Sequence, residues 1–158
     1  MRLALLTMIL LGVAIDSVLP TAHPHVEPAP HLVADVDRAV DTVIERRESG
    51  HFLTVAEVNG EPIRFVVDTG ADVVALTVGD ARRAHVAFDP ARFEVIGHGA
   101  SGDVRGQEVR LRDVVLDGKR ASDIGGVVLE SSPVSLLGQT YLRHLASVEI
   151  NGDRMTLR

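Results

Sequence analysis

The residues of this sequence best suited to chemistry lie in the run Asp68-Thr69-Gly70-Ala71. The alternating apolar residues Ile63, Phe65 and Val67 lead into it, and a period of two is typical of a half-buried strand. Burying a carboxylate at the end of such a strand costs free energy unless another group pairs with it or shares its proton. Two facing carboxylates meet this condition, with one protonated and the other ionised. Asp68 is therefore the candidate catalytic group.

The tripeptide Asp-Thr-Gly is a weak signal by itself, because Asp and Gly are common turn residues. An ordinary turn is the alternative. Two observations favour a catalytic loop. The tripeptide lies between two apolar runs, the second from Val73 to Val78, and a second motif, Ser135-Leu136-Leu137-Gly138, follows downstream.

With these two motifs the chain resembles the retropepsin-like (retroviral-type) aspartic proteases, in particular the small single-domain bacterial members with an N-terminal membrane segment. The resemblance extends from about Thr42 to Arg158. It implies an all-β fold, a closed β-barrel that forms half of an acid protease, with one short C-terminal helix. That helix would begin after Gly138, where Tyr141 and Leu142 give it an apolar face.

The resemblance also assigns roles by position. Asp68 would be the catalytic residue, and Thr69-Gly70-Ala71 would support the active-site loop, with Thr69 bonding across a two-fold axis. The strand Leu136-Leu137-Gly138 would lie beside the active site as a structural element. Asp72 would contact the substrate backbone, and an ordinary surface turn is its equal alternative.

The segment from Gly97 to Gly106 holds four glycines in ten residues, which is typical of a mobile hairpin tip. In the resembling family this position is the flap that closes over the substrate, and an ordinary hairpin is the alternative. Phosphate binding is disfavoured, because no helix with Lys-Ser/Thr follows and the neighbourhood is not basic. The flap would supply substrate-binding residues, namely His98, Gly99, Ala100, Ser101 and Gly102.

Three departures or limits bear on function. The flap lacks the glycine pattern of retroviral flaps, so their substrate specificity does not transfer. Gln139 stands where retroviral enzymes commonly carry Arg, which removes an ion pair that supports their dimer. Ala71 lacks the hydroxyl that would stabilise an ionised carboxylate, so we expect a milder pH optimum than that of pepsin-like enzymes.

The chain has 158 residues and one Asp-Thr-Gly, whereas a pepsin-like enzyme carries one such motif in each of two lobes. The second carboxylate must then come from a second chain, so the resemblance implies a homodimer. A net charge of −6, with four Phe and one Tyr, argues against nucleic-acid binding. The sequence has no Cys and no His-Glu-x-x-His, and no metal or other cofactor is expected.

The N-terminal segment predicts export. A basic start precedes the apolar run from Leu3 to Ile15, which can extend to Leu19 as a short anchor. We expect residues 1–19 to be a signal peptide or a retained membrane tether, and the protein to be periplasmic or anchored in the inner membrane facing the periplasm. Residues 20–41 would be a Pro/His-rich linker and membrane-proximal segment, and residues 42–158 the protease domain.

Apolar patterns and turn residues place the strands. A loose or helical segment over 32–40 would precede a hairpin of 42–46 with 52–58, and Asn59-Gly60 would make the next turn. Asp80 to His85 is compatible with a short helix. Turns are also expected at Asp117-Gly118 and at Asn151-Gly152-Asp153, the latter in a C-terminal hairpin that lies either at a dimer interface or at a plain sheet edge.

The function that these observations favour is an aspartic endopeptidase, which hydrolyses a peptide or protein substrate with water activated by an Asp dyad across a homodimer. The alternative is a catalytically silent, protease-like module of the cell envelope that binds peptides or dimerises. A generic exported β domain with a chance motif is a third interpretation. The intact Asp-Thr-Gly-Ala favours the first, because a pure binder gains nothing from a costly buried carboxylate.

Overall fold

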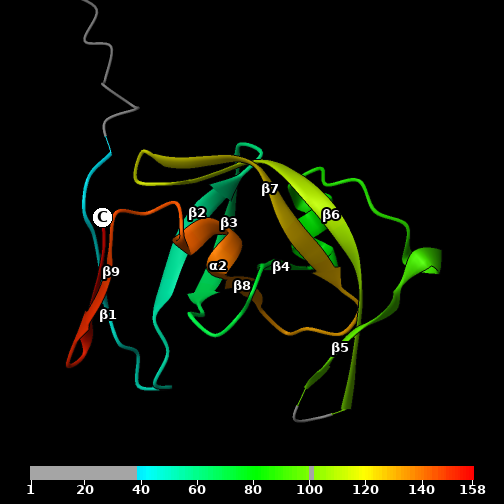
Figure 1. Cartoon of the computed structure of the whole chain (residues 1–158), viewed down its shortest axis with the longest axis horizontal. Coiled ribbons are helices and arrows are strands. Elements are labelled where there is room, and N and C mark those ends of the chain that lie inside the picture. Colours follow the sequence, from blue (N-terminus) through cyan, green and yellow to red (C-terminus); the bar gives the residue numbers. More distant parts are fainter. Residues whose placement is uncertain (1–38, 100–101) are drawn as a thin grey trace, which may run out of the picture. The chain divides into compact units, whose positions relative to one another are not determined.

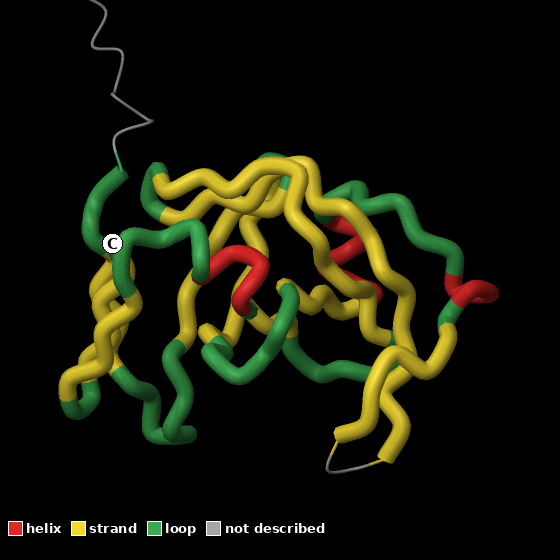
Figure 2. The backbone as a smooth tube through the Cα atoms, viewed as in Figure 1, coloured by secondary structure: helices red, strands yellow, loops and turns green. Residues whose placement is uncertain are grey.

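The computed structural model describes residues 39–99 and 102–158. The predicted signal or anchor segment, the linker and nearly all of the segment 32–40 lie outside this range. Most of the described chain is strand (Figure 2). The strands are, in order, β1 Thr42–Glu45, β2 Leu53–Val58, β3 Glu61–Val67, β4 Val74–Thr77, β5 Glu94–Gly99, β6 Gly102–Leu116, β7 Lys119–Leu129, β8 Ser135–Leu137, β9 Val148–Asn151 and β10 Arg154–Leu157.

The central sheet closes on itself as a six-stranded barrel (Figure 1). Its order is β2-β3-β8-β4-β7-β6, with β5 added outside β6. The last seam is short: β2 pairs with β6 through Glu57 and Val115 and through Val58 and Val114. Closure removes the edges that a flat sheet would leave unpaired. The expected all-β barrel of the retropepsin-like half-domain is thereby confirmed.

The alternating strand pattern places the core inside this barrel. Ile63, Phe65 and Val67 on β3 are buried, as their spacing predicts, and Arg64 between them is exposed. The two-residue turns also match the sequence, because Asn59-Gly60 and Asp117-Gly118 both have positive φ angles at each residue. Such turns suit the right-handed twist of the paired strands that they join.

The described residues form two short α-helices and one 3-10 turn. The predicted C-terminal helix is α2, a single turn over Gln139–Leu142. A second helix, α1, covers Val78–Arg83, and a 3-10 turn, η1, covers Pro90–Arg92. The helix expected at Asp80–His85 thus begins earlier, because the Thr77 side chain accepts a hydrogen bond from Asp80 N and caps its start.

One expected pairing is wrong. The segment 42–46 does not form a hairpin with 52–58: a single bridge from Arg46 to Phe52 joins them, while β1 pairs along its whole length with β10. The reason lies in the side chains, since Ile44 lies opposite Met155 and both are buried. This apolar match with the C-terminal hairpin outweighs the nearby turn. The result is a second sheet of order β1-β10-β9.

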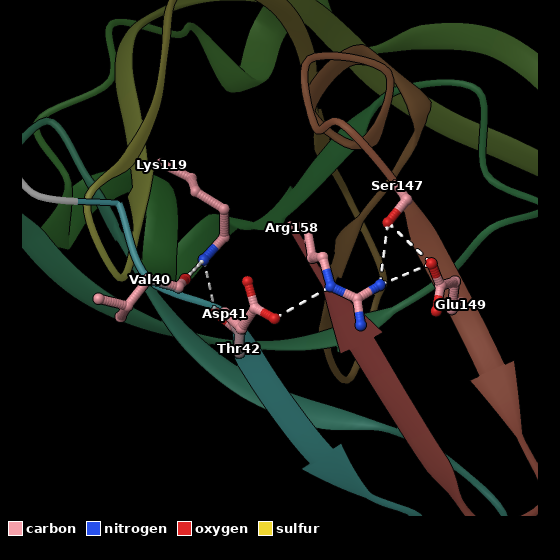
Figure 3. Close-up of polar contacts among 7 residues, drawn as sticks. All are labelled: Val40, Asp41, Thr42, Lys119, Ser147, Glu149 and Arg158. Carbon is pink, nitrogen blue, oxygen red and sulfur yellow. Dashed lines mark hydrogen bonds and ion pairs between the residues drawn. The ribbon is translucent and has the colours of Figure 1, made fainter.

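Two basic residues fasten this terminal sheet (Figure 3). Lys119 Nζ, at the start of β7, donates to the Val40 carbonyl and to Thr42 Oγ1, the latter at 2.9 Å. Arg158 Nε lies 3.0 Å from Asp41 Oδ2, and Arg158 Nη1 lies 2.6 Å from Glu149 Oε1. Burial lowers the pKa of Lys119, and the neighbouring carboxylates of Asp117 and Asp41 oppose that shift. The N- and C-terminal segments are thus held to the barrel and to each other.

Within the described residues, no helix is both long and apolar enough to cross a membrane. The expected anchor falls in residues 1–38, so it stays a prediction.

The single tyrosine reports on the core. Tyr141 is fully buried, and its hydroxyl donates to the Lys119 carbonyl at 2.8 Å. Burial raises the pKa of Tyr141 well above its usual value of about 10. The folded state therefore keeps a proton that the unfolded state loses above about pH 10, so stability should fall as the pH rises beyond that point. We expect tyrosinate absorbance at 295 nm to appear together with the loss of circular dichroism. Ionisation near pH 10 with the native signal intact would contradict this burial.

Candidate active site

The loop from Asp68 to Val73 joins β3 to β4, and β8 passes between these two strands. β8 runs parallel to β3, with Val67 opposite Leu137, and antiparallel to β4, with Ala75 opposite Leu136. Asp68 N–H donates to the Leu137 carbonyl at 3.1 Å, which extends the β3–β8 ladder by one residue. Leu136 and Leu137 of β8, followed by Gly138, thus lie beside the Asp68 loop, as the sequence predicts.

The short helix α2 holds the loop through its first N–H groups. Gln139 N–H donates to the Ala71 carbonyl at 2.8 Å, and Thr140 N–H donates to the Asp72 carbonyl at 3.1 Å. Helix-start N–H groups have no partner within their own helix, so these bonds satisfy both sides. Thr140 Oγ1 in turn accepts from Val74 N–H at 2.9 Å. The loop is thus pinned at Ala71, Asp72 and Val74.

Gly138, at the start of α2, is where the backbone before this helix comes closest to the Asp68 loop. A Cβ built at this position would lie 2.2 Å from the Val73 carbonyl oxygen and 2.7 Å from that of Ala71. No side chain fits there without moving backbone. The glycine of the downstream motif therefore serves to let α2 reach the loop carbonyls.

Asp68 is half-buried at the end of β3. Its Oδ1 accepts a hydrogen bond from Gly70 N–H at 2.9 Å, and no other described residue pairs with the carboxylate. Thr69 and Gly70 are exposed. One chain therefore presents one carboxylate, in a fixed orientation, on an open loop. No group of three His, Cys, Asp or Glu side chains that could hold a metal ion occurs in residues 39–99 and 102–158.

Gln139 has a role at the loop that sequence reasoning missed. Its side-chain Nε2 donates to the Thr69 carbonyl at 2.7 Å. The amide thus occupies the Thr69 carbonyl, and the Thr69 side chain has no hydrogen bond to any described residue. The sequence places Gln139 directly after Gly138, but that position by itself indicates only the replacement of an Arg and not a bond to Thr69.

Of the remaining predicted site residues, Asp72 lies on the loop, and the others lie apart from it or outside the described range. Asp72 is exposed, and its carboxylate makes no hydrogen bond or ion pair with a described residue. His98, Gly99 and Gly102 belong to the β5–β6 hairpin, where His98 Nδ1 lies 2.8 Å from Asp103 Oδ1. No hydrogen bond or ion pair joins the described part of this hairpin to residues 68–72. Ala100 and Ser101 lie outside the described residues, and the substrate contacts of the hairpin stay predictions.

Comparison with known proteins agrees with this geometry. The family model for the gag-polyprotein putative aspartyl protease matches residues 54–144. A crystal structure of a retropepsin-like aspartic protease from Rickettsia conorii superimposes with a TM-score of 0.63 at 31% identity, covering 76% of this chain and 91% of that one.

Two curated relatives are uncharacterized proteins. One, in the cobV 5′ region of Sinorhizobium sp., is 31% identical over 131 residues, which is 80% of this chain and 55% of the relative. The other, RP867 of Rickettsia prowazekii, is 31% identical over 117 residues, which is 74% of this chain and 51% of the relative. The chain thus spans about half the length of the curated relatives it matches.

The contact at Gly138 can be tested by adding one methyl group. Gly138→Ala places a Cβ against two backbone carbonyls, so we expect a loss of about 3 kcal/mol in the free energy of unfolding. Urea denaturation would measure it. Gly79→Ala is the control, because a Cβ at Gly79 in α1 meets no atom closer than Thr77 Oγ1 at 3.8 Å. Equal midpoints for the two variants would show that the loop does not depend on this approach.

Proposed function

Because the chain belongs to the retropepsin-like aspartic proteases, we propose that it is an endopeptidase in which two copies of Asp68, one from each protomer of a homodimer, activate a water molecule. The observation that carries this proposal is the state of Asp68 in one chain. Its carboxylate is fixed by a pinned loop, and among the described residues only Gly70 N–H bonds to it. Hydrolysis by this chemistry needs a second carboxylate, and the second protomer supplies it.

The reaction follows from that pair. The ionised carboxylate removes a proton from the water as it attacks the scissile carbonyl carbon. The protonated carboxylate donates to the carbonyl oxygen, which carries the developing negative charge. The tetrahedral intermediate then collapses: the C–N bond breaks, a proton passes to the leaving nitrogen, and the dyad again holds one proton. No metal is required for any step.

The loop surface supports a symmetric arrangement. Thr69 and Gly70 are exposed in the single chain, so both are accessible to a second copy. The Thr69 hydroxyl has no partner among the described residues, whereas its carbonyl is held by Gln139. A free hydroxyl on a fixed backbone is suited to bonding across a two-fold axis. A Cβ at Gly70 would lie 3.4 Å from Asp68 Oδ1, so glycine leaves space beside the carboxylate.

The terminal sheet supports dimerisation as well. Its outer strands, β1 and β9, each have one edge that pairs with no described strand. Val43 on β1 and Ile150 on β9 are 56% and 52% exposed. Open edges that carry exposed β-branched residues are ready to pair with another chain. We therefore propose that the second protomer adds to this sheet, so that the C-terminal hairpin lies at the dimer interface and not at a plain sheet edge.

We also propose export, with the protease domain in the periplasm, either released or anchored in the inner membrane. The support is the basic and apolar start of the sequence, Met1 to Leu19, followed by a proline-rich stretch.

A mixing experiment tests the shared dyad. The full chain, purified as wild type and as Asp68→Asn, is assayed on an unfolded protein substrate from pH 4 to pH 8. The isosteric variant should lose at least about a thousandfold in kcat/KM, because a catalytic group is removed. An equal mixture at saturating total concentration should retain about one quarter of the wild-type rate, because only wild-type pairs contain two carboxylates.

A retained rate of one half would mean that single chains act independently, and the dimeric dyad would then be wrong. Activity indifferent to Asp68→Asn would exclude Asp68 as a catalytic residue. A folded wild-type dimer without activity would favour the silent peptide-binding module. Because Ala71 provides no hydroxyl, we expect maximal activity above the strongly acidic range, and an optimum below about pH 3 would contradict that expectation.

A further inference from the structure

An open groove of about 490 Å³ begins where the catalytic loop ends. Val73, the residue after Asp72, forms one wall, and the neighbouring strands β6 and β7 form the rest. Val73 also fixes the position of the groove relative to the loop, because its carbonyl lies against Gly138 and Val74 pairs with Gly126 on β7. The groove is therefore continuous with the surface where the proposed substrate chain would lie.

Two adjacent glycines, Gly125 and Gly126, keep the groove open. Gly126 is tightly packed, since a Cβ would lie 3.0–3.1 Å from Leu111 and the Val74 carbonyl, and these neighbours would have to shift. Gly125 does have room: the nearest atom to its Cβ would be Thr140 Cγ2 at 3.9 Å. Tight packing thus accounts for glycine at 126 but not at 125. A side chain at 125 would occupy space that is now empty.

The groove is lined by valines and carries two charged residues. Half-buried Val73 and Val109 supply aliphatic surface, whereas Val127 is buried. β6 adds Glu108 and Arg110, which lie two residues apart on the face of the strand opposite to Val109. This combination suits a ligand with an aliphatic portion and a charged end. Which charge it would carry depends on which of the two residues is already paired.

Arg110 is paired. Its Nε donates to Asp123 Oδ1 at 2.9 Å, and its Nη2 lies 2.5 Å from Asp123 Oδ2. The hydrogen bond from Arg110 lowers the pKa of Asp123, so this pair stays ionised over the neutral range. Glu108, in contrast, makes no hydrogen bond or ion pair with a described residue. The net unpaired charge of the groove is therefore one negative carboxylate.

We propose that this groove is a substrate subsite that selects a lysine or arginine side chain, with the aliphatic stem against Val73 and the cationic end at Glu108. The inference rests on the proposed function, because it assumes that a peptide crosses the Asp68 loop. Lysine and arginine are the side chains that combine a long apolar stem with a terminal positive charge. Because Glu108 is exposed, the preference should be modest, about two- to fivefold over an uncharged side chain of equal length.

The test scans fluorogenic peptides in which each position in turn is lysine, norleucine or glutamate. The full-length wild type should show a higher kcat/KM for lysine at one position. Glu108→Gln should abolish that preference, and Glu108→Lys should reverse it in favour of glutamate. Glu57→Gln is the matched control, since Glu57 is an exposed glutamate on β2 without a side-chain partner among the described residues. It should leave the preference unchanged.

Filling the groove provides an independent variant. Gly125→Val adds a side chain where the backbone tolerates one, and it should remove the lysine preference while the protein stays folded. A wild-type enzyme without a basic preference, or a preference that survives both Glu108→Gln and Gly125→Val, would overturn the subsite. In either case the enzyme would remain a protease.

A binding measurement separates this inference from the proposed function. Fluorescence polarisation of the lysine and norleucine peptides is measured with Asp68→Asn, and with the same protein carrying Glu108→Gln. A lysine-selective affinity that depends on Glu108 supports the groove, even if the wild type hydrolyses nothing, and in that event only the catalytic proposal fails. If the peptides are neither bound nor cleaved, both proposals fail.

Discussion

The structure depends on how closely α2 approaches the loop that carries Asp68. At Gly138 a single methyl group would overlap the carbonyls of Val73 and Ala71. Because the approach is this close, the first N–H groups of α2 reach the Ala71 and Asp72 carbonyls and satisfy both. Among the described residues, backbone groups alone thereby fix the carboxylate. A loop built in this way is complete within one chain, and only the proposed chemistry requires a second chain.

The terminal strands are also held in place by polar groups that find their partners within the chain. β1 and the β9–β10 hairpin form their own sheet, and Lys119 and Arg158 join it to the barrel and to the preceding segment. A buried ammonium costs free energy unless it is bonded, and Lys119 meets this requirement with the Val40 carbonyl and Thr42 Oγ1. The point where the N-terminal segment enters the domain is thus held in place. A sheet fixed in this way can present its open edges to a second protomer.

Local signals predicted much of this fold, and non-local competition explains the rest. The Asn59-Gly60 turn and the β3 alternation were predictable, because each depends on a few adjacent residues. The pairing of β1 was not, since its partner β10 lies at the other end of the chain and a nearer turn competed with it. At the site, Asp68 and Gly138 were found from their motifs. The bond from Gln139 to Thr69 was not, because only the fold brings that amide to the loop.

β6 links the parts of the molecule that a substrate would contact. This strand of 15 residues runs from the Gly102 end of the hairpin, past Glu108 and Arg110, to the barrel seam at Val114 and Val115. Its inward residues hold the core, whereas Glu108 and Arg110 are exposed. The two faces of one strand thus separate stability from recognition. Side chains on the outer face can change the preference for a substrate without altering the packing that positions Asp68, which is why the groove is where specificity would be expected to vary.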